Sequence, residues 1–509
     1  MRHFTALDVV VLLAYLAATT LLGVWLGRGQ KSARDYFVAD KAIPWWAILF
    51  SVVATETSAL TFISIPGVAY LGNLTFIQVA LGYLVGRIVV SYTLLPRYYE
   101  GELVTAYSLL EKRFGIGTRR FASVTFMVTR AFGDSVRVFA TAIPIALILG
   151  PQVPREYVGP VSILLLGVFT IIYTYHGGMR AVVWTDVVQT TVYLLGALAA
   201  AWLIGRGVQG GWGEILAGAS ANGKLRLFDL SLGLDKPYTL AAGLIGGAFL
   251  SMASHGADQL IVQRLLAAPS VKGARKALIG SGVAVILQFL LFLLIGVGLY
   301  AYYQARHFAS PDAIFPSFIV DVMPAGLTGL VVAAILAAAM STVSGSLNSL
   351  SAATTHDIYL PITGRNADDP RVLKIGKIFT LFWAVILIGG ALLYHQEGTP
   401  VVVVALSIAS FTYGGLLGGF GLALLWPRAI QRDAITGMAI GIFAMTLVVF
   451  AKPITAAYPS LTPILGPFAS IAWPWYVLIG TVITIAAGVL SSYTHPAPEV
   501  VPELAEELS

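Results

Sequence analysis

The feature that most constrains this chain is a series of long apolar segments that runs along its whole length. A helix needs about 20 predominantly apolar residues to cross the hydrocarbon core of a bilayer. A soluble core stops growing beyond about 250–300 residues, so it could not bury so many segments. The sequence therefore predicts an all-α integral membrane protein with thirteen spans, at about 6–27, 43–69, 74–96, 119–149, 157–176, 183–205, 238–263, 277–303, 325–355, 372–394, 399–426, 433–451 and 470–492.

The distribution of basic residues predicts the orientation. Loops on the cytoplasmic side of a membrane carry an excess of Lys and Arg. With the N-terminus outside, the predicted cytoplasmic loops hold 19 Lys and Arg and the external segments hold 8. The first segment could be a signal peptide, but its length and the basic cluster Arg28, Lys31 and Arg34 behind it predict a retained helix. Residues 1–492 form one transmembrane domain in this reading, and the Pro- and Glu-rich tail 493–509 is a disordered cytoplasmic segment with the C-terminus inside.

Composition excludes several classes of function. The formal charge of +6 is spread over short loops between apolar runs, whereas nucleic-acid-binding proteins gather Lys and Arg on one folded face. The chain has no cysteine, so it has no disulfide and no thiolate metal site. An integral-membrane enzyme would need a catalytic set, and His356-Asp357, at a helix end, is the nearest such pair. A channel would favour a repeated filter loop, and a sensor would need an appended signalling domain.

Four sequence motifs indicate the class of membrane protein more specifically than hydropathy does. Together, and in this order, they resemble those of the sodium/solute symporter family, whose members include sodium–glucose, proline, sialic acid, monocarboxylate and iodide transporters. The likeness covers nearly the whole chain. The motifs are ATETSALT at 54–61 with Ile65-Pro66-Gly67 after it, GGMRAVVWTDVVQ at 177–189, SHGADQLIVQR at 254–264, and MSTVSGSLNS at 340–349.

The resemblance implies a LeuT-like fold. Two inverted repeats of five helices would occupy about 43–205 and 238–426, with one helix before them and two after. It also implies a multi-pass protein of the inner or plasma membrane that imports a small solute with sodium by alternating access. The partners would then be sodium ions, the solute and the lipid bilayer, with no nucleic acid.

A polar run in the second span predicts the main sodium site. Sodium, a hard cation, takes oxygen ligands, and backbone carbonyls become available in a membrane only where a helix unwinds beside a cavity. Thr55 to Ser58 interrupt the second span in this way. The resemblance implies that sodium binds the carbonyls of Ala54, Thr57 and Ala338 and the hydroxyls of Ser341 and Thr342. The alternative is that the two hydroxyls only bond to their own helix.

The resemblance also implies a second sodium site in some members. Its residues here would be Asp186 and Ser344, but Gly345 stands where a relative with the full site has a further serine. Asp186 could instead be a waypoint for departing sodium or a charge at a helix N-terminus near the cytoplasmic boundary.

Charged residues inside predicted spans indicate function, because their burial in a membrane is costly. Glu56 lies in the predicted helix break, and we expect it to favour a nearby cation or to pair with an arginine. Arg130, Asp134 and Arg137 share one helical face, which leaves one positive charge in excess. The sialic-acid branch is similar in using an arginine of this helix for the substrate carboxylate, so Arg137 is the expected carboxylate ligand. The alternative is an ion-pair ladder of Glu56, Arg87 and Asp134 without a ligand.

The remaining polar residues leave the substrate open. Sugar-transporting relatives use a lysine in the eighth span, which is absent here, and an asparagine where this chain has Asp258. A sugar is thus less favoured than a carboxylate, while amino acids and inorganic anions stay open. Ser58, Thr61, Gln78 and Asp258 are candidate cavity residues, although such side chains also hold helices together.

Histidines and tryptophans near helix ends have simpler readings. His176 and His255 lie beside glycines and are expected to cap or pack rather than to couple protons. Four tryptophans are read as interfacial anchors: Trp45, Trp46, Trp473 and Trp475.

Overall fold

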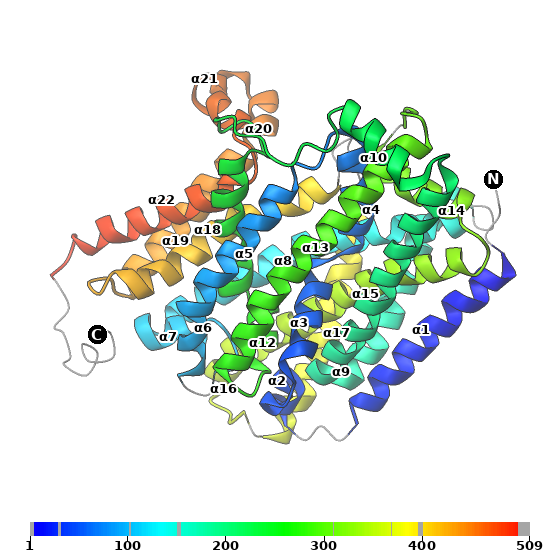
Figure 1. The fold of residues 1–509 in the computed structure, drawn as a ribbon. Coiled ribbons are helices and arrows are strands. Elements are labelled where there is room, and N and C mark those ends of the chain that lie inside the picture. The colour runs from blue at the N-terminus through cyan, green and yellow to red at the C-terminus, as the bar shows by residue number, and fades with distance from the viewer. Residues whose placement is uncertain are drawn as a thin grey trace.

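The fold is a bundle of long helices. The computed structural model describes residues 5–28, 32–100, 103–149, 154–308, 310–367, 369–394 and 401–496, and within these ranges every regular element is helical. Figure 1 shows the helices running roughly together across the molecule, with α10, α20 and α21 gathered at one end and α2 and α16 at the other. The predicted disordered tail 493–509 begins with four described residues, of which His495 contacts Asp433 and Arg428, and its remainder lies outside the described residues.

Helices occupy each of the thirteen segments that hydropathy predicts. The long ones are α1 (Ala6–Leu26), α3 (Trp45–Glu56), α4 (Ala59–Leu71), α5 (Ile77–Tyr92), α8 (Ile116–Leu149), α9 (Arg155–Gly207), α13 (Val271–Tyr302), α15 (Leu327–Ala353), α17 (Pro370–Leu393), α18 (Val401–Leu425), α19 (Gln431–Val449) and α22 (Trp475–Ser492). Eight helices of the described chain are long and apolar enough to cross a membrane, or nine when the bent pair α3–α4 counts as one span. The number of spans and their orientation remain predictions.

Shorter helices connect and cap the bundle. They are α2 (Ala33–Val38), α6 (Leu94–Tyr99), α7 (Ser108–Phe114), α10 (Gly211–Ala221), α11 (Gly247–Met252), α12 (Gln259–Leu266), α14 (Ile314–Val322), α16 (Leu360–Thr363), α20 (Ala451–Ala457) and α21 (Thr462–Leu465). Three π-helical turns extend these helices: η2 (Ala242–Gly246) leads into α11, η3 (Ala253–Ala257) follows α11, and η5 (Thr354–Tyr359) joins α15 to α16.

Two spans are broken, and the breaks position the site. The second span stops at Glu56, because Thr57 leaves helical geometry (φ −86°, ψ 83°), and α3 and α4 then diverge by 61°. This break lies in the polar run 55–58, where the sequence predicts it. The seventh span is broken at Asp258 (φ −99°, ψ 123°), whose carboxylate accepts a hydrogen bond from the Leu260 amide and so caps α12.

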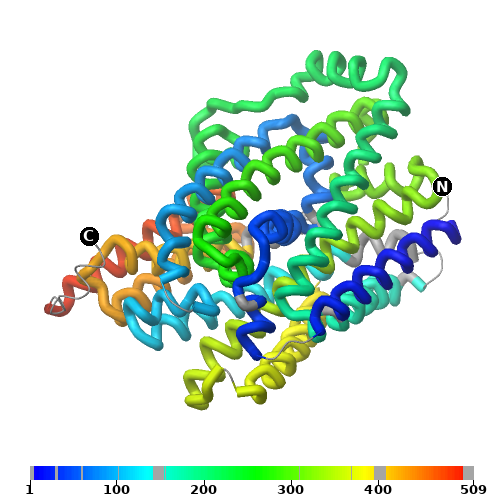
Figure 2. Tube along the Cα trace, turned by 60° about the horizontal axis from the view of Figure 1, so that its bottom comes forward, coloured from blue at the N-terminus to red at the C-terminus, as the bar shows by residue number. Residues whose placement is uncertain are grey.

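Small residues allow the closest helix contacts. A Cβ atom on Gly82 or Gly86 of α5 would lie 2.1 Å from the Gly243 carbonyl oxygen or 2.3 Å from that of Ala248. The backbones of α5 and of the segment around α11 therefore touch, as is typical of helices packed in membranes. Helix α9 contains both the fifth and the sixth predicted segments, joined at Gly178, whose φ of 52° suits glycine. Figure 2 shows α1 lying along the outer edge of the bundle, and α1 packs on α9 and α15.

The tryptophans divide into two pairs. Trp45 and Trp46 are 42% and 40% exposed, as membrane-interface anchors would be. Trp473 and Trp475 are buried, and Trp475 packs with Ala242. The reading of this second pair as interfacial anchors is wrong, because the start of α22 packs against η2.

Candidate functional site

Side chains next to both helix breaks line a cavity of about 130 Å³. It lies between α3, α4, α5, α8, α13, α18 and the segment from α11 to α12, so segments far apart in the sequence form its walls. Its polar lining includes Thr55, Glu56, Ser58, Thr61, Tyr83, Arg130, Arg137, Ser254, His255 and Tyr413. Apolar side chains such as Phe76, Phe289 and Ile261 complete it. An apolar cavity with a few convergent polar groups is typical of a small-molecule site.

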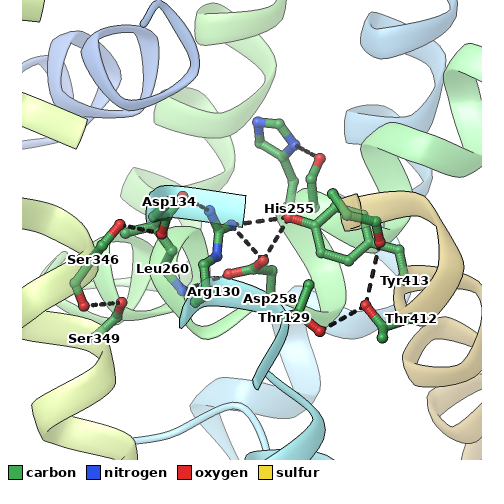
Figure 3. A network of polar contacts seen from close by, with 12 residues as sticks. Thr129, Arg130, Asp134, His255, Asp258, Leu260, Ser346, Ser349, Thr412 and Tyr413 are labelled. Atoms are coloured by element: carbon green, nitrogen blue, oxygen red, sulfur yellow. Dashed lines mark hydrogen bonds and ion pairs between the residues drawn. The ribbon is translucent and has the colours of Figure 1, made fainter. Parts of the chain in front are cut away.

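Arg130 is the centre of a buried polar network (Figure 3). Its guanidinium donates to Asp258 at 2.5 Å, to the Tyr413 hydroxyl at 2.9 Å and to Asp134 at 3.3 Å. The Tyr413 hydroxyl in turn donates to Asp258 at 2.7 Å, and Ser346 donates to Asp134 at 2.6 Å. This network joins α8, α12, α15 and α18, and it neutralises the Arg130 charge.

Arg137 differs from Arg130 in its surroundings. Its nearest carboxylate oxygen, on Asp134, lies 3.6 Å away, and its side chain is 22% exposed where it lines the cavity. Asp134 already accepts hydrogen bonds from Arg130 and Ser346. Of the two arginines on this face of α8, Arg137 is therefore the more weakly paired, although the Nε of Arg130 also lacks a partner among the described residues.

Glu56 forms a second ionic group on another wall of the cavity. Its carboxylate contacts the guanidinium of Arg87, which is fully buried and also donates to Ser281 at 2.7 Å. His255 Nε2 lies 3.8 Å from Glu56 and has no hydrogen-bond partner among the described residues. Glu56 thus pairs with an arginine, as expected. The alternative ion-pair ladder is present only in part, because Arg87 pairs with Glu56 but does not reach Asp134, which pairs with Arg130 in a separate group.

Three of the five residues expected at the main sodium site line a smaller cavity of about 10 Å³, whereas Ser341 and Thr342 are not part of its wall. Ala54, Thr57 and Ala338 line it, together with Gln189, Thr190 and Tyr193 of α9. A site of about 10–15 Å³ admits one water-sized occupant. The side-chain amide oxygen and nitrogen of Gln189 both lack a hydrogen-bond partner in the described part of the chain, so this wall has a further oxygen that could bind a cation.

The two hydroxyls expected at that site behave differently. Ser341 donates to the Asp186 carboxylate at 2.6 Å instead of bonding to its own helix. Thr342 donates to the Ala338 carbonyl at 3.1 Å, which is the alternative that the sequence left open. Both hydroxyl oxygens keep lone pairs that a cation can use. Ser344 donates to the Ser341 carbonyl at 3.0 Å.

Asp186 lies at the junction of four helices. It is fully buried and accepts hydrogen bonds from Ser51 of α3 and Ser341 of α15. The guanidinium of Arg264, from α12, lies 3.4 Å from Asp186 Oδ2. Asp186 is thus part of a closed polar cluster rather than an exposed charge at a helix N-terminus.

Two expected cavity residues lie elsewhere. Gln78 donates to the carbonyls of Thr75 and Tyr238 and accepts from the Asp229 amide, so it fastens a loop and does not line the cavity. Asp258 is held by Arg130 and Tyr413 behind the cavity wall. Ser58 and Thr61 do line the cavity. His176 is exposed at the kink of α9, where its Nδ1 lies 2.8 Å from the Ile172 carbonyl.

Sequence reasoning missed several residues of the site. Tyr413 carries no motif, and only the packing of α18 brings it to Arg130. Gln189 and Arg264 are the last residues of two of the quoted motifs. The available signal was the position of Gln189 one helical turn after Asp186 and that of Arg264 in the helix after Asp258. His255 was read as a packing residue, but it lines the cavity.

Comparisons with known proteins all indicate the same family. The model of the sodium:solute symporter family matches residues 36–441. The chain is 30% identical to the sodium/sialic acid symporter NanT of Aliivibrio fischeri, over 96% of this chain and 94% of that protein. It is 31% identical to the sodium/sialic acid symporter SiaT of Proteus mirabilis, over 87% of this chain and 90% of the relative.

One solved structure is similar to this chain over almost the entire length of both proteins. It is the substrate-bound, outward-open state of a Na⁺-coupled sialic acid symporter, and it superimposes with a TM-score of 0.84 at 29% identity. The alignment covers 97% of this chain and 99% of that one.

Proposed function

Because the chain belongs to the sodium:solute symporter family and is a sodium-coupled symporter of the cell membrane, we propose that it imports a small carboxylate-bearing solute by alternating access. The relatives that it resembles in sequence and structure carry sialic acid, a sugar that bears a carboxylate. The solute would bind in the cavity between the two helix breaks.

The observation that supports this proposal most directly is the environment of Arg137. Its guanidinium lines the cavity, is partly exposed to it and has only a distant contact with Asp134. A guanidinium presents a planar fork of donors that matches a carboxylate. The terminal nitrogens of Arg130 cannot bind a carboxylate together without breaking the bonds to Asp258 and Tyr413.

Charge balance favours binding of a carboxylate and a sodium ion together. Three charged residues line the cavity, Glu56, Arg130 and Arg137, and their ion-pair partners behind the wall are Arg87, Asp134 and Asp258. Their formal charges cancel. A carboxylate alone would add a negative charge to a poorly solvated region, and sodium alone would add a positive one. Binding both preserves neutrality, which is a physical basis for coupling.

Sodium would bind at the break between α3 and α4. The ligands that we propose are the carbonyls of Ala54, Thr57 and Ala338 and the hydroxyls of Ser341 and Thr342. Since the Ser341 hydroxyl donates its hydrogen bond to Asp186, its oxygen lone pairs are available to the ion. The ion would thus join the first repeat, at α3, to the second repeat, at α15, and favour the outward-open state that accepts the solute.

Binding of sialic acid and of its methyl ester to the purified protein tests the proposed carboxylate contact. The ester keeps the sugar but removes the negative charge. We expect the acid to bind in sodium but not in potassium, and the ester to bind at least about tenfold more weakly, as the loss of a charge-assisted hydrogen bond predicts. Equal binding of acid and ester would contradict the role of Arg137.

A further inference from the structure

We propose that a basic cluster at one end of the bundle binds the phosphate group of an anionic phospholipid. The cluster consists of Arg28, Arg180, Lys374 and Lys377, from the end of α1, the kink of α9 and the start of α17. These residues lie in or next to loops that the distribution of Lys and Arg predicts to be cytoplasmic. The inference goes beyond the proposed function, because it depends neither on sodium coupling nor on the solute.

Three helices meet at the turn between the two halves of α9. A Cβ atom on Gly27, which follows α1, would lie 2.3 Å from the Cα atom of Gly177, so these two backbones touch. Tyr36 of α2 donates a hydrogen bond to the Thr174 carbonyl at 3.1 Å. Helix α17 packs on both α2 and α9. The turn therefore holds the end of α1 at the same end of the bundle as α2 (Figure 1).

The two arginines of the cluster flank this contact. Arg28 directly follows Gly27. Arg180 lies three residues after Gly177, just beyond the kink at Gly178. Both arginines are exposed, so their guanidinium groups are accessible at the surface beside the turn.

The two lysines come from the first turns of α17. The Lys377 ammonium lies 5.6 Å from the ring centre of Tyr36 and 5.5 Å from that of Tyr175, so it contacts two aromatic faces. Lys377 is half-buried, whereas Lys374, one helical turn earlier on the same side of α17, is exposed. Because Tyr175 belongs to the turn that α1 contacts, the lysines lie beside the same turn as the arginines.

Acidic side chains of the described chain do not compensate the cluster, since none of its four cations has an ion-pair partner there. Asp369, at the start of α17, instead pairs with Arg365 at 3.1 Å and accepts a hydrogen bond from the Arg371 amide. Asp35 of α2 has Arg34 beside it in the sequence. Uncompensated basic clusters between helices on the cytoplasmic side of a membrane bind anionic lipid headgroups.

The apolar surface next to the cluster favours a lipid over a soluble anion. Lys374 begins a stripe along one side of α17 that continues with Ile378, Leu381 and Val385, which are 48%, 41% and 72% exposed. Trp25, in the last turn of α1, is also exposed, as is typical of tryptophan at the level of the headgroups. A lipid whose phosphate binds the cluster would lay its acyl chains along the stripe, whereas inorganic phosphate would gain nothing from it.

Native mass spectrometry of the purified, full-length protein in detergent tests the site directly. The delipidated protein is titrated with phosphatidylglycerol, or with phosphatidylcholine of the same acyl chains. We expect phosphatidylglycerol to bind about tenfold more tightly or better, because its charge is not cancelled within the headgroup. Equal binding of the two lipids would overturn the proposal and would mean that the basic side chains only extend into water. Displacement of the lipid by an equal concentration of inorganic phosphate would overturn it as well.

Two double variants of equal net charge locate the site. Lys374→Gln combined with Lys377→Gln should weaken phosphatidylglycerol binding by about 10- to 30-fold, since each basic residue near an anionic headgroup contributes about fivefold. Arg206→Gln combined with Lys236→Gln removes two exposed charges from the segments that flank α10 and should bind like the wild type.

Equal weakening in both double variants would show attraction by net charge alone and would overturn the assignment. If the double lysine variant does not fold, Lys374→Gln alone decides, because that side chain is exposed. Its affinity for phosphatidylglycerol should fall by about fivefold, and an unchanged affinity would remove Lys374 and the proposed site together.

Discussion

Arg130 and Arg137 lie on the same face of α8, yet their environments give them different tasks. Their spacing from Asp134 places all three on one face, and this much follows from the sequence. The sequence does not show that Asp258 and Tyr413, from α12 and α18, bind the guanidinium of Arg130. Those contacts join residues more than 120 positions apart, so they depend on how the helices pack. The choice of Arg137 as ligand needs the fold.

Replacing Arg137 tests the carboxylate ligand at the scale of one side chain. We expect Arg137→Gln to weaken solute binding by about 10- to 100-fold, because a charge-assisted pair is lost. Arg137→Lys should retain part of the affinity, since it keeps the charge but not the fork. Calorimetric titration measures both. Arg206→Gln, an exposed arginine that stacks on Trp202 at the end of α9, is the matched control and should bind like the wild type. Wild-type affinity in Arg137→Gln would refute the assignment.

Replacement of Ser341 or Thr342 tests the proposed sodium site at the scale of one side chain. Ser341→Ala removes a proposed ligand and should raise the sodium concentration for half-maximal uptake about tenfold or more. Thr342→Ala should act in the same direction. Ser349→Ala, on the same helix, is the control, because the Ser349 hydroxyl donates only to the Ser346 carbonyl of its own helix. A Ser341→Ala variant with unchanged sodium dependence would remove Ser341 from the site.

At the scale of elements, the two broken helices carry the site. The polar run 55–58 predicted the first break. The second break, at Asp258, was not predicted, because Asp258 was read as a substrate contact. A carboxylate can cap a helix or bind a ligand, and the sequence does not distinguish the two. The structure shows Asp258 capping α12 and binding Arg130 at once.

The buried network of Asp258 should therefore stabilise the bundle. Asp258→Asn leaves Arg130 poorly compensated, and such a loss typically costs about 3–5 kcal/mol. Tyr413→Phe removes one hydroxyl between two charged groups and should cost less, about 1–3 kcal/mol. Thermal unfolding in detergent should give a clearly lower Tm for Asp258→Asn than for Tyr413→Phe. The reverse order would mean that the network does not hold the seventh span to α8.

Close packing of α5 against the segment around α11 gives a second prediction for elements. Gly86→Ala places a methyl group 2.3 Å from the Ala248 carbonyl oxygen, so the helices must separate. We expect a large loss of thermal stability and of folded protein, because overpacking costs about 1–3 kcal/mol or more. Gly159→Ala, where no atom lies within 4 Å of the added carbon, should unfold like the wild type. Equal stability of the two variants would show that α5 does not need this contact.

At the scale of the whole molecule, hydropathy predicted the helical segments and the motifs predicted the family. Both signals are local, which is why the sequence carries them. The two inverted repeats and the orientation in the membrane remain expectations that the family implies. The separation of Glu56–Arg87 from Arg130–Asp134 and the burial of Arg264 beside Asp186 depend on contacts across the bundle. These are the features that sequence patterns could not supply.

Uptake into proteoliposomes tests the central claim, that sodium drives the import of a carboxylate solute. The purified protein is reconstituted, and uptake of radiolabelled sialic acid is followed with an inward sodium gradient or with potassium in its place. We expect accumulation above the external concentration in sodium, none in potassium, and collapse of the accumulated pool when the gradient is dissipated. Uptake that proceeds equally in sodium and potassium would contradict sodium coupling.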